Sequence, residues 1–167
     1  MKMKTIINIK EKESAIENVD VFRKKKYENK DIRFSNTDLK KLNEKIRLNL
    51  FSKNDLFISS ETLWELMQDE GGSGKHNYHG LTAEDIVDAL GSITDPFAII
   101  DNKTNRYAII TTTLSHFDEP LMIVIEIGSG LVINKNANVN KIVTMYPRSD
   151  VETMIEKIIG KKIYYKK

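Results

Sequence analysis

Leu121-Met122-Ile123-Val124-Ile125-Glu126-Ile127 is the most strand-like stretch of the chain, and it decides the expected fold. Six of its seven residues are apolar, and four of them are β-branched, a composition that favours a strand. The run is followed at once by Gly128-Ser129-Gly130, which predicts a turn. The second half of the chain is therefore expected to be built on a β-sheet.

Further strands are expected on both sides of this run. The sequence predicts strands over residues 97–100, 106–113 and 139–146, with a hairpin loop at 101–105 and a turn at 115–120. The short loops between them imply an antiparallel meander. A last helix is expected to begin at Ser149-Asp150, and residues 163–165 could add a short edge strand.

The first half of the chain shows helical signals instead. Leu39, Leu42 and Ile46 follow one another at helical spacing, and Ser59-Ser60 could cap a second helix. Thr82-Ala83-Glu84-Asp85 resembles a capping box at the start of a third helix. We therefore expect an α+β fold with N-terminal helices, a central antiparallel sheet of about four strands, and a C-terminal helix. Residues 4–9 could be a short strand or a disordered start, and residues 51–58 an extended segment.

Charge divides the chain into two predicted parts. Residues 1–53 carry 15 Lys and Arg against 8 Asp and Glu, a balance of +7, whereas residues 54–167 carry 11 against 16, a balance of −5. We expect residues 1–53 to form a basic helical segment and residues 54–167 to form the α+β domain. The basic segment could contact a polyanion, or it could be a solvated, lysine-rich helical face.

Composition excludes several classes of protein. The chain has no cysteine, which rules out disulfides and thiolate chemistry and fits a reducing compartment. No apolar run approaches the ~18 residues of a membrane span, and the N-terminus lacks the apolar region of a signal peptide. We therefore expect a cytoplasmic protein without a membrane partner.

The best candidate for acid–base chemistry is His79, because histidine titrates near neutral pH and this one directly precedes a predicted helix. His76 lies in a looser loop, and His116 is expected to be a surface residue. Gly71-Gly72-Ser73-Gly74-Lys75 departs from a phosphate-binding loop, because His76 stands where Ser or Thr is required. Neither a metal site nor a Gly-x-Ser-x-Gly hydrolase motif is supported.

Phosphodiester cleavage without a metal needs an acid or base, a cation and hydroxyl donors. Two predicted strands supply such groups. Alternate residues on a strand share a face, so Thr111 pairs with Thr113 and Thr144 with Tyr146. Strand threonines can equally be simple β-formers. The cations and hydroxyls considered are Arg106, Thr111, Thr112, Thr113, Thr144, Tyr146, Arg148 and Ser149.

Several stretches in one order resemble a known family. They are Phe57-Ile58-Ser59-Ser60-Glu61-Thr62-Leu63-Trp64, His79-Gly80-Leu81-Thr82-Ala83-Glu84-Asp85-Ile86, Ile93-Thr94-Asp95-Pro96-Phe97-Ala98-Ile99 and Asn140-Lys141-Ile142-Val143-Thr144-Met145-Tyr146-Pro147. This series resembles the phage-associated nuclease domains of the barnase/EndoU/colicin/RelE-like type, including those at the C-termini of MuF-type phage head proteins. The resemblance covers about two-thirds of the chain.

The resemblance implies a compact ribonuclease-like toxin fold that needs no metal or other cofactor. It implies His79, Tyr146 and Thr112 as catalytic residues, and Thr144 and Arg148 as substrate-binding residues. Arg106 and Lys141 are added as substrate-binding residues because, with Lys75 and Arg148, they could make a local cleft basic. The implied function is a metal-independent ribonuclease-like toxin or effector from a phage or mobile element, a hydrolase that binds RNA and has an immunity protein as its partner.

The alternative is an inactive phage or mobile-element protein that binds and inhibits a host protein. The balance of −5 over residues 54–167 favours that alternative, because RNA sites are usually positive. Geometry discriminates between the two: the enzyme requires His79 to meet Tyr146 and Thr111 or Thr112 around one spot, whereas a His79 that caps the helix and faces away from the sheet would oppose it.

Overall fold

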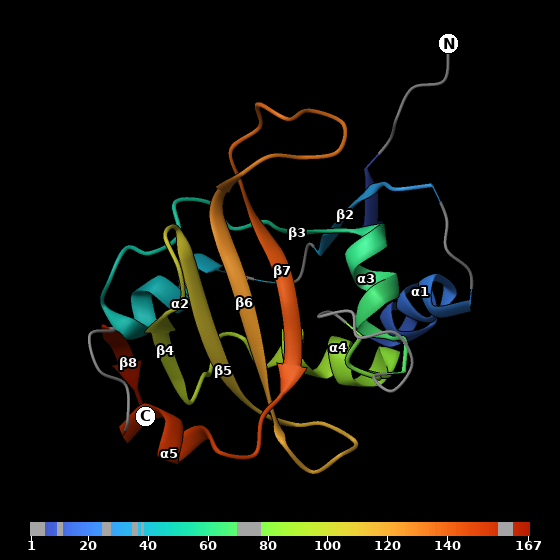
Figure 1. Cartoon of the computed structure of the whole chain (residues 1–167). Helices are drawn as coiled ribbons and strands as arrows, with labels where there is room; N and C mark the ends of the chain where they lie inside the picture. Colours follow the sequence, from blue (N-terminus) through green and yellow to red (C-terminus); the bar gives the residue numbers. More distant parts are fainter. Residues whose placement is uncertain are drawn as a thin grey trace.

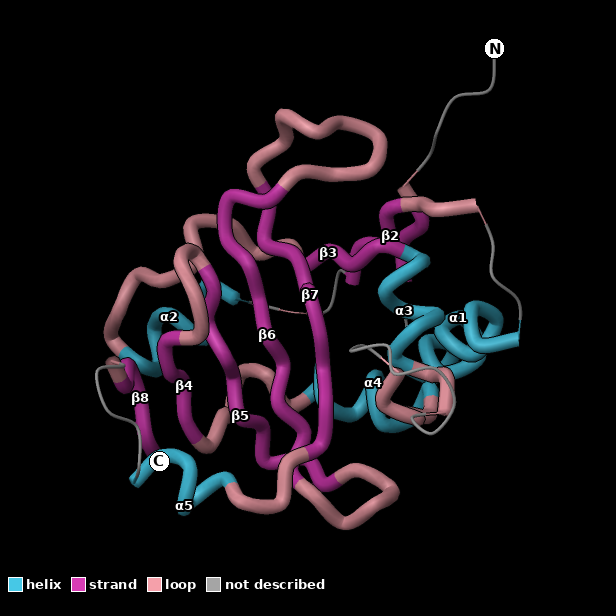
Figure 2. The backbone as a smooth tube through the Cα atoms, in the orientation of Figure 1, coloured by secondary structure: helices cyan, strands magenta, loops and turns pink. Residues whose placement is uncertain are grey.

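A computed structural model describes residues 6–9, 12–24, 28–34, 37, 39–69, 78–156 and 162–167 of the chain. Within these residues eight strands form one mixed sheet, in the order β1-β2-β3-β7-β6-β5-β4-β8. Figure 1 shows the sheet with α1, α3 and α4 on one side of β7 and with α5 below β4 and β5. Figure 2 shows the same path coloured by secondary structure.

The strands are β1 (Ile7–Ile9), β2 (Asp31–Phe34), β3 (Leu56–Ser59), β4 (Ala98–Asp101), β5 (Arg106–Leu114), β6 (Pro120–Ser129), β7 (Val139–Pro147) and β8 (Ile163–Lys166). The helices are α1 (Lys12–Lys24), α2 (Leu39–Ile46), α3 (Ser60–Leu66), α4 (Ala83–Gly91) and α5 (Val151–Glu156). Among these helices, none is long and apolar enough to cross a membrane.

The predicted meander is confirmed. Strands β4, β5, β6 and β7 pair antiparallel in sequence order, and the run at residues 121–127 lies inside β6. The capping box is confirmed as well, because the Thr82 hydroxyl accepts from the Asp85 amide and the Asp85 carboxylate accepts from the Thr82 amide. The last helix and the short strand at residues 163–166 also form.

The predicted sheet of about four antiparallel strands behind N-terminal helices is wrong. Three short strands from the first half of the chain extend the sheet, and they alternate with helices along the sequence. β1 lies parallel to β2, and β3 lies parallel to β7. Strands of three or four residues are too short to show periodicity, and pairing across about eighty residues leaves no local signal. The Asp31–Phe34 strand was missed for this reason.

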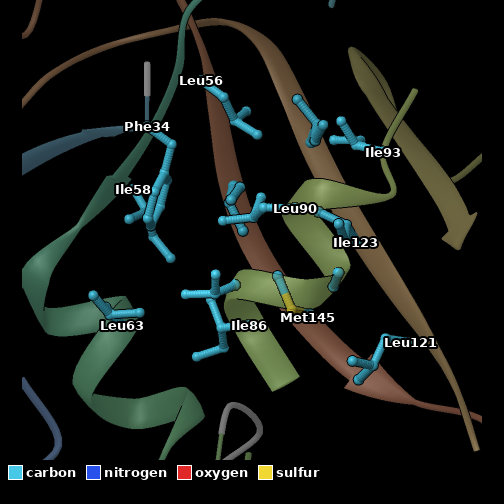
Figure 3. Close-up of a cluster of buried hydrophobic side chains, with 14 of the residues drawn as sticks. Phe34, Leu56, Ile58, Leu63, Ile86, Leu90, Ile93, Leu121, Ile123 and Met145 are labelled. Atoms are coloured by element: carbon cyan, nitrogen blue, oxygen red, sulfur yellow. The ribbon is translucent and has the colours of Figure 1, made fainter. Parts of the chain in front are cut away.

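The larger apolar core lies between one face of the sheet and the helices α1 to α4. Figure 3 shows Ile86 and Leu90 of α4 between Ile58 and Leu63 on one side and Ile123 and Met145 on the other. Full burial of each such side chain contributes roughly 1.5–3 kcal/mol. A smaller cluster, on the opposite face of β4 to β6, packs against Val151 and Ile155 of α5.

The short pairing between β3 and β7 leaves one edge of β7 open for the candidate site. β3 pairs with β7 through Leu56 and Phe57, and the chain then turns into α3. On the side away from β6, the part of β7 beyond Lys141 therefore has no paired strand among the described residues. It lies next to α3 and the segment that leads into α4. The predicted domain boundary after residue 53 stays a prediction, although strands from both sides of it join one sheet.

Candidate functional site

His79 is positioned by a short, well-anchored segment. The Gly80 amide donates to the Gln68 carbonyl at 2.7 Å, and the Leu81 amide donates to the Leu66 carbonyl at 2.9 Å. Leu81 is buried, and Thr82 then caps α4. His79 therefore does not cap the helix. It is held three residues ahead of the cap, against the end of α3.

His79 turns towards β7. Its Nε2 lies 3.4 Å from the hydroxyl oxygen of Thr144, and its ring centroid lies 5.5 Å from that of Tyr146. The two rings are tilted by 36°, and all three side chains are half-buried. A distance of 3.4 Å marks a long hydrogen bond, and the imidazole tautomer decides which atom donates. A partly accessible imidazole thus lies beside a hydroxyl and a phenol.

Strand geometry explains why Thr144 and Tyr146 lie together. Met122 and Val124 alternate along β6 and so share one face. Their partners on β7 are Tyr146 and Thr144, which therefore face the same side. The register between β6 and β7 shifts between Val124 and Ile125. Thr144 is therefore opposite Val124, while Ile142 is opposite Ile125 and stays in the larger core.

Arg148 adds a cation to this group. Its guanidinium donates to the Asp150 carboxylate at 2.7 Å, and it also hydrogen-bonds the Tyr146 hydroxyl. The hydrogen bond with Asp150 is the main reason that the pKa of Arg148 is raised above its ordinary value. The structure therefore brings together four of the seven predicted site residues: His79, Thr144, Tyr146 and Arg148.

Arg106 and Lys141 lie one row further along the same face. Glu126 pairs with both residues across the sheet, and it accepts a hydrogen bond from the Arg106 guanidinium at 2.8 Å. This bond is the main cause that lowers the pKa of Glu126. The Lys141 ammonium donates to the Gly130 carbonyl at 3.3 Å. Both cations are thus near the group but already have partners.

Thr112 lies apart from the group formed around His79. Its hydroxyl donates to the Asp95 carbonyl at 3.4 Å, and it lines a separate cavity of about 450 Å³ with Phe97, Asp150 and Val151. Thr111 is buried and donates to the Leu121 carbonyl. The geometric condition set from the sequence is therefore met only in part: Tyr146 lies beside His79, but neither Thr111 nor Thr112 does, and the threonine next to His79 is Thr144. His76 and Lys75 lie outside the described residues.

Residues 72–167, more than half of the chain, match the phage MuF-C-terminal domain family. The chain belongs to this family. The predicted association with phages is confirmed by this match. No curated protein and no solved structure matches the chain. The match to the MuF family spans α4, β4 to β8 and α5, and so it includes His79 and all of β7.

The prediction that His116 is a surface residue of this MuF-family domain is confirmed, because the side chain is exposed, but the sequence did not reveal its ion pair. His116, in the β5–β6 turn, places its Nδ1 2.5 Å from the Asp85 carboxylate, and its backbone amide donates to the same carboxylate at 2.9 Å. Burial raises the pKa of Asp85, but the hydrogen bonds from Thr82 and His116 outweigh it and hold the pKa below its ordinary value. The sequence showed Asp85 as the third helical residue after the cap Thr82, but it did not show that His116, 31 residues away, would be its partner.

The two histidines are anchored around the same helix end. A Cβ atom built at Gly80, next to His79, would lie 3.7 Å from the ring of Phe117, and that ring lies 3.9 Å from the ring of His116. Gly80 has a φ of +62°, a conformation that glycine adopts without strain. Among the described residues, no three His, Asp or Glu side chains gather as metal ligands.

Proposed function

We propose that this MuF-family domain cleaves RNA without a metal, with His79 as the acid–base group. The observation that carries the proposal is the position of His79, whose Nε2 lies 3.4 Å from Thr144 and whose ring lies beside that of Tyr146. Imidazole is the usual group for proton transfer near neutral pH, and this one is only half-buried.

In the proposed reaction, neutral His79 takes the proton of a ribose 2′-hydroxyl. The 2′ oxygen forms a bond to phosphorus, the bond from phosphorus to the 5′ oxygen breaks, and the 5′ oxygen takes a proton from solvent. Arg148 donates to the Tyr146 oxygen, and the O–H of Tyr146 can donate in turn to a phosphate oxygen. The products are a 2′,3′-cyclic phosphate and a 5′-hydroxyl.

The other residues have supporting roles in this proposal. Thr144 orients the imidazole, and Arg148 stabilises the charge that builds up on the phosphate. Arg106 and Lys141, one row away, contact a neighbouring phosphate. Thr112 has no catalytic role in the proposed reaction, because it lies on β5, and β6 separates it from Thr144 and Tyr146 on β7.

A second candidate is an inactive MuF-family domain that binds and inhibits a host protein. Two large apolar side chains of the β5–β6 hairpin favour it: Leu114 is 59% exposed and Phe117 is 49% exposed. Exposed apolar residues next to one another are typical of protein-binding surfaces. Phe117 is also close to Gly80, so such a partner would cover the approach to His79.

The test of the enzyme uses a single-stranded RNA and the same RNA with one 2′-deoxy substitution, both incubated with the full chain in EDTA. We expect cleavage of the first with 2′,3′-cyclic phosphate ends, and resistance at the substituted position. Cleavage at the 2′-deoxy position would exclude the proposed 2′-hydroxyl attack. The binding protein would be supported instead if the chain cuts neither RNA, and if the immobilised chain retains a host protein that is lost when Leu114 and Phe117 are substituted.

A further inference from the structure

Among the described residues, exposed basic side chains gather at one end of the long strands and exposed acidic side chains at the other. One end of the sheet lies where β4 and β6 finish and where β5 and β7 begin, and the loop at residues 130–138 extends beyond it (Figure 1). We call this the cationic end. Its basic residues are Lys53, Lys103, Arg106, Lys135 and Lys141.

The acidic residues near the cationic end already have partners. Glu126 accepts from Arg106, and Asp101 accepts from the Tyr164 hydroxyl at 2.7 Å. The buried carboxylate of Asp31 accepts from the Val132 and Ile133 amides at 2.7 and 2.9 Å. These carboxylates keep their negative charge, but the five basic residues outnumber the three of them, and the cationic end is therefore positive.

Exposed carboxylates gather at the opposite end of the same strands, where Arg148, Lys166 and Lys167 offset part of their charge, and we call it the acidic end. Asp118 and Glu119 lie in the β5–β6 turn, and Asp150 and Glu152 lie where β7 leads into α5. The negative balance over residues 54–167 therefore does not describe the surface around the start of β7. Charge separated in this way orients a polyanion towards one end of the molecule.

A groove of about 330 Å³ lies at the cationic end. It is lined by Asn49, Ser52, Lys53, Asn105, Asn138 and Asn140, together with apolar and glycine residues, and by no carboxylate. Amide side chains donate and accept, so they can bind phosphate oxygens and the edges of unpaired bases. The groove joins the loop that carries Lys103 to the loop that carries Lys135.

The walls of the groove are held in place. The Lys53 ammonium donates to the Asn138 carbonyl at 2.6 Å, and the Asn140 amide donates to the Lys53 carbonyl at 2.9 Å. At Gly130 a Cβ atom would lie 2.6 Å from the Lys135 carbonyl oxygen, so the loop folds tightly upon itself. A fixed site loses less entropy on binding than a mobile one.

We propose that the cationic end binds the backbone of single-stranded RNA whose scissile phosphate lies at His79. This inference rests on the proposed function, and it adds the path of the substrate. Lys141 and Thr144 lie opposite Glu126 and Val124, which are two residues apart on β6, about 7 Å at the rise of a strand. The RNA runs from Thr144 past Lys141 on one face of the sheet, crosses the end of the sheet, and enters the asparagine-lined groove on the other face, away from the acidic end.

The experiment measures binding of a fluorescent oligouridine to the full chain carrying His79→Ala, so that the RNA stays intact, over a series of salt concentrations. The test variant adds Lys103→Gln and Lys135→Gln, two exposed residues outside the proposed catalytic group. The control adds Lys45→Gln and Lys166→Gln, which lie at the other end of the sheet near Asp95 and Ala98. Both variants lose the same charge.

We expect the test variant to bind roughly tenfold more weakly, with a salt slope smaller by about 1.4, because each phosphate contact on a single strand contributes about 0.7. The control is expected to keep its affinity within about twofold. Equal losses in the two variants, or no binding by His79→Ala alone, would overturn the inference. RNA that binds through these lysines but is not cleaved by the wild-type chain would reject the proposed function alone.

Discussion

The imidazole of His116 lies 2.5 Å from the carboxylate of Asp85, and this pair fixes the β5–β6 turn to the start of α4. Asp85 is 5% exposed, and it also accepts the Thr82 amide as part of the capping box. One buried carboxylate thus joins two segments that are distant in the sequence. His79 and Gly80 lie immediately before the same helix end.

Asp85→Asn is expected to lower the free energy of unfolding by about 1–3 kcal/mol, because an amide leaves buried hydrogen-bonding groups without full partners. Chemical denaturation followed by circular dichroism measures the change. Asp88→Asn on the same helix is the control, because Asp88 is exposed, and it should change the value by less than about 0.5 kcal/mol. Equal effects of the two substitutions would contradict the role given to Asp85.

The stabilisation by Asp85 should depend on pH. Its pKa is lower in the folded chain than the ordinary value of 3.8, so the stabilisation is complete above 3.8 and is lost as the pH falls through the folded-state pKa. Unfolding measured over an acidic pH series should therefore show a steeper loss for the wild type than for Asp85→Asn. Parallel curves would show that Asp85 has the same pKa in both states.

The Asp31 carboxylate is expected to hold the loop between β6 and β7. Asp31→Ala removes the acceptor of the Val132 and Ile133 amides and should cost about 1–3 kcal/mol. Hydrogen exchange should quicken at these two amides. Asp55→Ala is the control, because Asp55 is exposed and forms only a long ion pair, 3.8 Å, with the Arg33 guanidinium. Unchanged exchange in Asp31→Ala would exclude this anchoring.

Two glycines should respond to alanine in opposite directions. Gly130→Ala would place a Cβ atom 2.6 Å from a backbone oxygen and should destabilise the chain by about 1–3 kcal/mol. Gly91 is in the last turn of α4, and a Cβ atom there meets nothing within 4 Å. Gly91→Ala should stabilise by about 0.5–1 kcal/mol through helix propensity. Thermal unfolding of both variants checks the two signs.

The proposed orienting role of Thr144 can be separated from its packing. Thr144→Val keeps the shape but loses the hydroxyl, and it should lower the RNA cleavage rate by roughly tenfold or more. Thr144→Ser keeps the hydroxyl and should retain most of the rate. Single-turnover cleavage with saturating enzyme measures both. If serine lost as much as valine, packing and not the hydroxyl would be responsible.

The sequence was informative where one element is long and regular. β5, β6 and β7 have nine or ten residues each, and the run at residues 121–127 marked the centre of the sheet correctly. The capping box at Thr82 was also readable, because its two partners are three residues apart. β1 and β3 were expected only as a possible strand at residues 4–9 and an extended segment at residues 51–58, and β2 was not expected, because short strands are stabilised by distant neighbours and by burial.

The candidate site shows the same division. Thr144, Tyr146 and Arg148 were expected together because they alternate along one strand and its end, and they lie together. The resemblance grouped Thr112 with them, but Thr112 lies on β5, and β6 separates that strand from β7. The partners of His116 and Arg106 depend on pairing across the sheet and on the packing of a turn, which no spacing in the sequence encodes.

The most direct test of the proposed function is the single-turnover rate of RNA cleavage in EDTA by the wild-type chain, His79→Ala and His116→Ala. We expect cleavage by the wild type, a fall of at least roughly a hundredfold in His79→Ala, and a rate within about threefold of wild type in His116→Ala. Circular dichroism spectra should show that both variants are folded. Cleavage by His79→Ala at the wild-type rate, or none by the wild type, would contradict the account.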